Sequence, residues 1–329
     1  MNTIKTAFTA VLALAILATP VFASGSQEAQ TPEQTTENAA DTPEATTVDF
    51  AEVGWLDIQA TTTTTRVVLE ALGYDTTSTT VSVPLAYEGM AGSDVDVFLG
   101  NWMPSMATIA NQYFDAGSVE QYALNLEGAK YTLAVPTYLA DQGLQDFSDI
   151  ADFGEELEYQ IHGIEAGNDG NLLIQQMIDE DAFGLGDFSV VDSSEAGMLA
   201  EVRARAENEQ PIVFLGWEPH PMNAYLDMTY LTGGDDYFGP DFGAAEVYTN
   251  VRSGYAEEYP NLGQFFSNLQ FTLTMENEIM TAINEGSDAR DAAVAWLQEN
   301  PAILEDWLDG VSAVDGSNGL QTVRAALDI

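Results

Sequence analysis

The chain has 329 residues, of which 53 are acidic and 8 are basic, so its formal net charge is −45. This charge excludes nucleic-acid binding, which needs a basic surface for the phosphates, and disfavours docking on an anionic membrane. Because 46% of the residues are hydrophobic, we expect a packed fold with an acidic, strongly hydrated surface, as in proteins of salt-loving organisms.

The first residues are typical of an exported protein. Lys5 precedes an apolar stretch at residues 7–18 that only Thr9 interrupts, and small side chains follow at the −3 and −1 positions of a cleavage site. Residues 1–23 are therefore predicted to be a signal peptide. The chain has no cysteine, so we expect neither disulfides nor a lipid anchor, and we expect a periplasmic location. Residues 24–47, rich in Ser, Thr, Glu and Pro, are predicted to be a disordered arm.

Short apolar runs bounded by turn residues predict a series of strands. The predicted strands are Val48–Trp55, Thr79–Leu85, Val95–Leu99, Tyr131–Pro136, Tyr159–Gly163 and Ile212–Leu215. Helical periodicity predicts helices over Asp57–Leu72, Asn171–Phe183 and Ser194–Glu207, and mainly helices from Pro260 onward. Threonine is a poor helix former, so the run at residues 61–65 leaves open a later start for the first helix. This alternation predicts a mainly parallel α/β architecture.

Three tryptophans follow predicted strands or glycine turns in similar local sequences. They are Trp55 in Gly-Trp-Leu-Asp, Trp102 in Gly-Asn-Trp-Met-Pro and Trp217 in Gly-Trp-Glu-Pro. Since α/β folds bind ligands at the carboxyl ends of their strands, three such rings could converge into an aromatic cage, the usual receptor for a quaternary ammonium ion. The alternative is that all three belong to the core. Trp296 and Trp307 lie among helix-periodic apolar residues and are assigned to the core.

Signatures of catalysis and of metal binding are scarce. The only histidines are His162 and His220, and without cysteine the usual zinc sites are not available. There is no Gly-x-Ser-x-Gly motif and no phosphate-binding loop. The aspartates at 235, 236 and 241 lack the spacing of a calcium loop, and a solvated surface loop is favoured there. We therefore predict no metal and no cofactor.

The turn Gly-Asn-Asp-Gly-Asn at residues 167–171 leads directly into a predicted helix. At least one of its residues is expected to cap that helix. An Asn side chain there could also donate a hydrogen bond to a ligand hydroxyl and accept one from it. The two roles are compatible, because a capping turn lies where a ligand would bind.

Three segments, residues 54–57, 97–104 and 214–221, resemble the substrate-binding proteins of glycine betaine/choline ABC importers, and most of all their choline-binding branch. Residues 247–252 and 275–280 extend the similarity toward the C-terminus. The resemblance implies an aromatic cage and two polar residues that bind the hydroxyl end of the ligand. The implied cage is Trp55, Trp102, Tyr131 and Trp217, and the implied polar residues are Asp57 and Asn168.

The resemblance also implies the bilobed periplasmic binding protein fold (type II), with two α/β lobes and a ligand cleft between them. We place lobe 1 at residues 48–128 and 236–329, and lobe 2 at residues 129–235. A binding protein of this kind performs no chemistry. It works as the solute-binding component of an importer for osmoprotectants, with a permease in the inner membrane as its partner, and we expect a monomer.

The charge of the predicted site residues restricts which ligand can bind there. A trimethylammonium head donates no strong hydrogen bond, so its affinity must come from ring faces and displaced water. Asp57 would attract the cation and accept a hydroxyl hydrogen bond, but would repel the carboxylate of glycine betaine. No Arg or Lys lies in these motifs, although backbone N–H groups or His220 could receive that carboxylate. Choline is favoured, with glycine betaine as the alternative. Two other classes stay open. One is an exported hydrolase of choline esters with His162, His220 or an Asp/Glu pair as acid–base groups, and the other is a surface protein whose tryptophans are all core.

Overall fold

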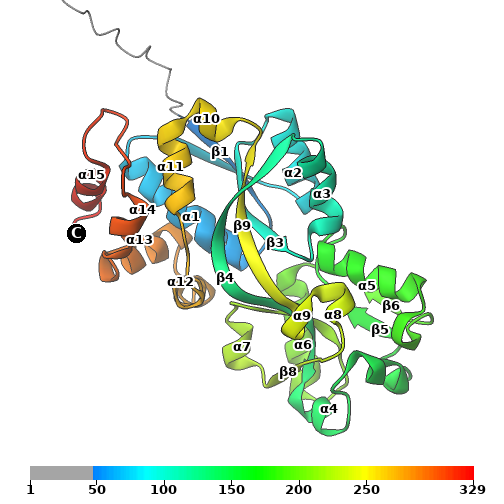
Figure 1. Cartoon of the computed structure of the whole chain (residues 1–329). Coiled ribbons are helices and arrows are strands. Elements are labelled where there is room, and N and C mark those ends of the chain that lie inside the picture. The colour runs from blue at the N-terminus through cyan, green and yellow to red at the C-terminus, as the bar shows by residue number, and fades with distance from the viewer. Residues whose placement is uncertain (1–46) are drawn as a thin grey trace, which may run out of the picture. The chain divides into compact units, whose positions relative to one another are not determined.

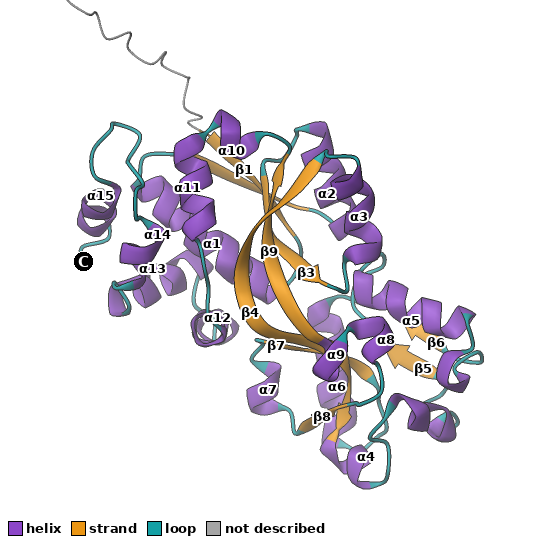
Figure 2. Ribbon diagram, viewed as in Figure 1, coloured by secondary structure: helices purple, strands orange, loops and turns teal. Residues whose placement is uncertain are grey.

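The computed structural model describes residues 47–329, and within them nine strands form one curled sheet (Figures 1 and 2). The predicted signal peptide and all but the last residue of the predicted arm lie outside the described residues. The strands are β1 (Thr47–Glu52), β2 (Asp75–Thr80), β3 (Val97–Met103), β4 (Val119–Pro136), β5 (Gln160–His162), β6 (Ser189–Val191), β7 (Phe214–Glu218), β8 (Met228–Tyr230) and β9 (Ala244–Arg252).

The strand order is β2-β1-β3-β9-β4-β7-β5-β6, with β8 paired to β4. The outer strands pair in parallel: β1 with β2 and β3, and β5 with β6 and β7. The central pairs, β3–β9, β4–β9, β4–β7 and β4–β8, are antiparallel. The expectation of a mainly parallel sheet is therefore wrong. The two long strands β4 and β9 lie at the middle of the sheet and join its two parallel sets (Figure 2).

Helices connect the strands and cover the sheet (Figure 1). Those before β9 are α1 (Leu56–Ala71), α2 (Val83–Gly92), α3 (Ala107–Asp115), α4 (Thr137–Asp141), α5 (Asp169–Asp179), α6 (Glu195–Glu207), α7 (Met222–Tyr225), α8 (Asp235–Phe238) and α9 (Pro240–Gly243), with 3-10 turns at Phe147–Phe153 and Ala182–Gly184. Those after β9 are α10 (Tyr255–Glu258), α11 (Pro260–Asn268), α12 (Leu273–Asn284), α13 (Ala289–Glu299), α14 (Ile303–Trp307) and α15 (Gly319–Ala326). The prediction of a helical C-terminal part is confirmed.

The predicted strand at Thr79–Leu85 is wrong. The strand β2 ends at Thr80, and α2 begins at Val83 after an extended N-cap residue, Ser82. Pro84 lies in the first turn of α2, where its missing N–H costs nothing and its fixed φ suits a helix. The proline thus starts a helix where the apolar residues around it had indicated a strand.

The threonine run does not delay the first helix, because α1 begins at Leu56. The hydroxyls of Thr61, Thr64 and Thr65 each donate a hydrogen bond to the carbonyl oxygen four residues earlier, at 2.7–2.9 Å. This bonding satisfies buried hydroxyls within the helix itself. The helix α1 can therefore bury its threonines, and it packs against α12 and α13.

The two tryptophans assigned to the core differ in exposure. Trp307 is 1% exposed, and its indole N–H donates to the carbonyl oxygen of Gln270 at 2.9 Å. Trp296 is only partly buried, and its N–H donates to Glu278 at 2.7 Å. Trp307 is a core residue as predicted, whereas Trp296 lies at the edge of the core.

The boundary predicted after residue 128 falls inside β4, which continues from its pairing with β9 into its pairing with β7. The second predicted boundary, after residue 235, falls at the start of α8, before β9. A strand that is shared by both lobes has no sharp boundary, so the division at residues 128 and 235 stays a prediction.

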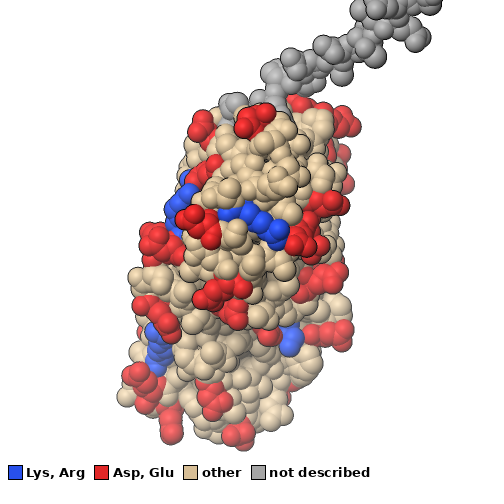
Figure 3. Space-filling model, turned by 90° about the vertical axis from the view of Figure 1, so that its left-hand side faces the viewer, with Lys and Arg blue, Asp and Glu red and all other residues tan. Residues whose placement is uncertain are grey.

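Acidic side chains are spread over the whole face seen in Figure 3, while basic side chains are few. With a net charge of −45, the acidic side chains repel one another and destabilise the folded state. Salt screens this repulsion, because the distance over which charges interact falls to about 3 Å at 1 M ionic strength. We expect the melting temperature to rise by about 5 °C or more between dilute buffer and molar NaCl. Scanning calorimetry measures it, and equal melting temperatures in the two solutions would contradict the expectation.

Candidate functional site

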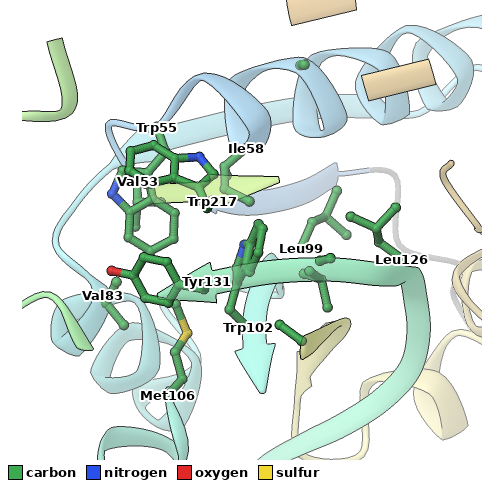
Figure 4. Close-up of a cluster of buried hydrophobic side chains, with 14 of the residues drawn as sticks. Val53, Trp55, Ile58, Val83, Leu99, Trp102, Met106, Leu126, Tyr131 and Trp217 are labelled. Carbon is green, nitrogen blue, oxygen red and sulfur yellow. The ribbon is translucent and has the colours of Figure 1, made fainter. Parts of the chain in front are cut away.

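Four aromatic rings meet around one cavity (Figure 4). The empty space between the lining side chains, part of which is open to solvent, measures about 270 Å³. Its lining residues are Trp55, Asp57, Trp102, Tyr131, Ile164, Asn168, Asp169 and Trp217. All six residues that the sequence singled out are among them, and no lining residue exposes more than 7% of its surface.

The ring-bearing residues come from separate elements. Trp55 is the N-cap residue of α1 and has extended backbone angles. Trp102 is near the end of β3, a strand whose residues are nearly all buried. Tyr131 on β4 and Trp217 on β7 are directly opposite each other in the antiparallel register. Because paired residues on neighbouring strands point to the same face, this register places the Tyr131 and Trp217 rings side by side.

The Tyr131 ring is inclined to the rings of Trp102 and Trp217 and stacks on neither. The Trp102 and Tyr131 ring centroids are 6.1 Å apart with planes at 60°, and those of Tyr131 and Trp217 are 6.3 Å apart at 76°. Inclined rings form walls with different orientations, so several faces can point at one enclosed group. The negative faces of such rings attract a cation that carries no hydrogen-bond donor.

Asn168 fixes one wall of the cavity. It is the N-cap of α5, and its Oδ1 accepts from the backbone N–H of Gly170 at 2.8 Å and of Asn171 at 3.3 Å. The same oxygen accepts from the Tyr131 hydroxyl at 2.9 Å. A Cβ at Gly170 would collide with that hydroxyl, so this close approach requires glycine. Asn168 therefore caps the helix and orients the tyrosine at once.

Asp169 is a site residue that sequence reasoning missed. Its Oδ1 accepts from the Asn168 side-chain amide at 3.0 Å, and the residue is 2% exposed. The signal available was its place directly after the N-cap, but an acidic residue in the first turn of a helix is fully explained by the helix dipole. Only the three-dimensional position assigns Asp169 to the cavity.

The two aspartates are held at raised pKa values. Burial and then the nearby Glu195 raise the pKa of Asp57 to about 7, against the opposing effect of hydrogen bonds that include the one from the Trp102 indole at 3.3 Å. Burial raises the pKa of Asp169 to about 6. Burial and then Asp57 raise the pKa of Glu276, behind the site, well above its usual range. The cavity is therefore acidic, and none of its described lining residues is Lys or Arg.

One oxygen of each aspartate has no partner. Among the described residues, Asp57 Oδ1 and Asp169 Oδ2 are two of the four buried side-chain polar atoms without a hydrogen bond. Leaving a buried acceptor unpaired costs about 1–3 kcal/mol, and more when it is charged. Two unpaired acceptors in the wall of one cavity are what a ligand with a positive charge and a hydroxyl donor would satisfy.

Neither histidine lines the cavity. His220 is buried, with Nδ1 accepting from the Met222 N–H at 3.0 Å and Nε2 beside Glu195 at 3.2 Å. His162 lies on β5, where burial, as the main cause, lowers its pKa. Residues 47–329 contain no group of His, Asp and Glu that could hold a metal ion, and none of their helices is both long and apolar enough to cross a bilayer.

Comparison with known proteins gives consistent matches. A family model described as the substrate-binding domain of ABC-type glycine betaine transport systems, OpuAC, matches residues 46–299. Two solved structures of an ABC-transporter choline-binding protein, one with choline and one unliganded and semi-closed, are 53% identical to the chain. Each covers 86% of this chain, which in turn covers 98% and 99% of theirs, and the TM-scores are 0.85 and 0.80. Glycine betaine/carnitine transport binding protein GbuC of Listeria monocytogenes is 33% identical over 165 residues, 50% of this chain and 54% of GbuC.

These matches confirm both the predicted family resemblance and the predicted fold class, the bilobed type II fold of periplasmic binding proteins. The relatives are binding components of transporters. The chain belongs to the OpuAC family, the substrate-binding domains of ABC-type glycine betaine transport systems.

Proposed function

We propose that the protein binds choline in this cavity and delivers it to the permease of an ABC importer. The observation that carries the proposal is the make-up of the cavity wall. Four aromatic rings surround the cavity, two aspartate oxygens in its wall have no hydrogen-bond partner, and none of the described lining residues is Lys or Arg. The likeness to a choline-binding protein solved with choline, at 53% identity, supports it. Titration calorimetry with choline, acetylcholine, glycine betaine and proline betaine at high salt tests the proposal, and no heat of binding from choline would refute it.

The energetics suit a small cation. Each well-placed ring contributes roughly 0.5–2 kcal/mol of cation–π attraction. Four rings would supply much of the roughly 8 kcal/mol that micromolar affinity requires. The trimethylammonium group would lie among Trp55, Trp102 and Trp217. The hydroxyl would donate to the free oxygen of Asp57 or of Asp169, with Asn168 beside them.

Glycine betaine is the alternative ligand in the same cage. Its carboxylate would meet Asp57 and Asp169, both buried and without a basic residue among the lining side chains to compensate. Repulsion between like charges in a site of low dielectric disfavours that arrangement. Choline brings no negative charge, so the same aspartates select it.

Replacing Asp57 with Asn tests this selection. The variant loses the negative charge but keeps a side chain of the same shape, so choline affinity is expected to fall roughly 10-fold or more while glycine betaine affinity falls less or rises. Calorimetry with both ligands on the same preparation gives the ratio. Equal losses for the two ligands would show that Asp57 does not discriminate between them.

An exported hydrolase of choline esters is the competing class. Among the described lining residues none is serine or histidine, so the nucleophile and base of a serine esterase are not at the place where the quaternary amine would bind. The acid–base groups that remain there are the carboxylates of Asp57 and Asp169, and we assign them to binding the ligand. We propose that the protein is not an enzyme. Tight reversible choline binding without turnover of acetylcholine supports this reading, and release of acetate at the rate of an esterase would overturn it.

The remaining parts of the proposal concern the cellular setting. Export and a periplasmic location rest on the predicted signal peptide, and a salt-loving source with a role in osmoprotection rests on the net charge of −45. We propose that the protein acts as a monomer. Ligand bridging the two lobes would stabilise a closed state, which the permease recognises.

A further inference from the structure

The start of helix α1 receives its cap from a distant part of the chain. Trp55 occupies the N-cap position, and its side chain makes no capping hydrogen bond. Instead, Oε2 of Glu195 accepts a hydrogen bond at 3.1 Å from the backbone N–H of Leu56, 139 residues away. Because the first N–H groups of a helix lack internal partners and carry partial positive charge, a carboxylate there is stabilising.

The other oxygen of Glu195 is bound to His220. Nδ1 of His220 accepts from the Met222 N–H at 3.0 Å, so the ring proton must lie on Nε2. That N–H then donates to Glu195 Oε1 at 3.2 Å, and both side chains are buried. The Glu195 carboxylate thus accepts one hydrogen bond from Leu56, the residue after Trp55, and one from His220, which lies three residues after Trp217.

This carboxylate supports the cage from outside. The His220 ring lies 5.1 Å from the Trp217 ring at 60°, so the histidine backs that wall. Glu195 contacts the backbone next to Trp55 but is not among the residues lining the cavity. It therefore holds two walls of the cage together without reaching the enclosed space.

A second carboxylate holds the same wall. The Trp55 indole N–H donates to both oxygens of Glu165, at 2.9 and 3.1 Å. Glu165 and Glu195 both belong to the segment predicted as lobe 2, whereas Trp55 belongs to lobe 1. Both contacts exist only while the two segments are together.

We propose that Glu195, held by His220, is a positioning residue for ligand binding that fastens the Trp55 wall of the cage to the Trp217 wall and so prolongs the closed, ligand-bound state. The inference rests on the proposed function, because it presupposes a ligand in the cage. Glu195 and His220 both belong to the segment predicted as lobe 2 and stay together when the lobes separate, whereas the Leu56 N–H would then bond to water. The bond that the loss of Glu195 removes from the closed state alone is therefore the one to Leu56. The effect should therefore appear in the dissociation rate.

Stopped-flow tryptophan fluorescence with choline in molar NaCl measures both rates. For Glu195→Ala we expect dissociation to quicken and affinity to fall roughly 10- to 100-fold, with the association rate little changed. Glu195→Gln should recover part of the loss, because its carbonyl oxygen can still accept from Leu56. Glu207→Ala, at the exposed end of the same helix, is the matched control and should behave as the wild type.

A double-mutant cycle completes the test. If Glu195 and His220 act as one unit, Glu195→Ala combined with His220→Ala should be little worse than Glu195→Ala alone. An unchanged dissociation rate in Glu195→Ala, or fully additive losses, would overturn the inference. If the circular dichroism of Glu195→Ala shows that this variant does not fold, the dissociation rates of Glu195→Gln and His220→Ala test the inference in its place. Wild-type dissociation rates in both variants would overturn it. A wild type that binds no choline refutes the proposed function instead, which separates the two failures.

Discussion

Replacing Trp217 with alanine is expected to weaken choline binding by roughly 30-fold or more. The change removes a cation–π contact worth up to about 2 kcal/mol when desolvated, and it also opens the cage to water. Trp217 is 4% exposed and lies against both Tyr131 and His220, so its loss also frees two neighbouring rings. Titration calorimetry at high salt measures the effect.

Two variants make this result specific. Trp217→Phe keeps a ring face in the wall and should retain most of the affinity. Trp296→Ala removes a partly buried tryptophan on α13, outside the cage, and should leave choline affinity unchanged. If Trp296→Ala weakened choline binding as much as Trp217→Ala, the loss would reflect general destabilisation and not the cage.

Choline affinity is also expected to fall by roughly 10- to 100-fold between pH 8 and pH 5. The pKa of Asp57 is about 7 and that of Asp169 about 6, so both are ionised at pH 8 and mostly neutral at pH 5. A bound cation favours the ionised carboxylates, so by linkage choline binds more tightly as pH rises through these values. Binding at intermediate pH should therefore release protons, which calorimetry in buffers of different ionisation enthalpy detects.

Glycine betaine and one variant serve as controls for the pH effect. The betaine carboxylate meets less repulsion when the aspartates are neutral, so betaine affinity should fall less than choline affinity, or rise, as pH drops. Asp57→Asn should lose the part of the choline profile near pH 7 and keep the part near pH 6. A flat choline profile from pH 8 to pH 5, with the protein folded throughout, would contradict the charge-based account of the site.

The aromatic residues that line the cavity could be found from the sequence because they lie in repeated, recognisable settings, and their role in binding a ligand stays a prediction. Trp55, Trp102 and Trp217 each follow a glycine or a strand end, and the family resemblance added Tyr131. Parts that depend on long-range pairing were not predictable. The strand β9 was missed, and only the last residues of β4 were predicted, because polar residues such as Gln121, Glu127 and Glu246 interrupt their apolar runs and the two strands are defined by pairing with each other.

Buried polar residues explain the other omissions. Asp169 and Glu195 each looked like an ordinary acidic residue in the first turn of a helix. Their importance comes from contacts with distant segments, and no local pattern reports such contacts. The proline that starts α2 was misread for a related reason, since residues 79–85 alone do not decide between strand and helix.

The shared oxygen of Asn168 constrains how this site can change during evolution. Asn168 caps α5 and holds Tyr131, and the Tyr131 hydroxyl in turn occupies the space that a side chain at position 170 would need. A mutation at any one of these positions therefore weakens a helix start, misplaces a ring or creates a clash before it can improve contact with another substrate. Descendants with a new specificity should differ at several of these positions together, and single-step intermediates should be rare.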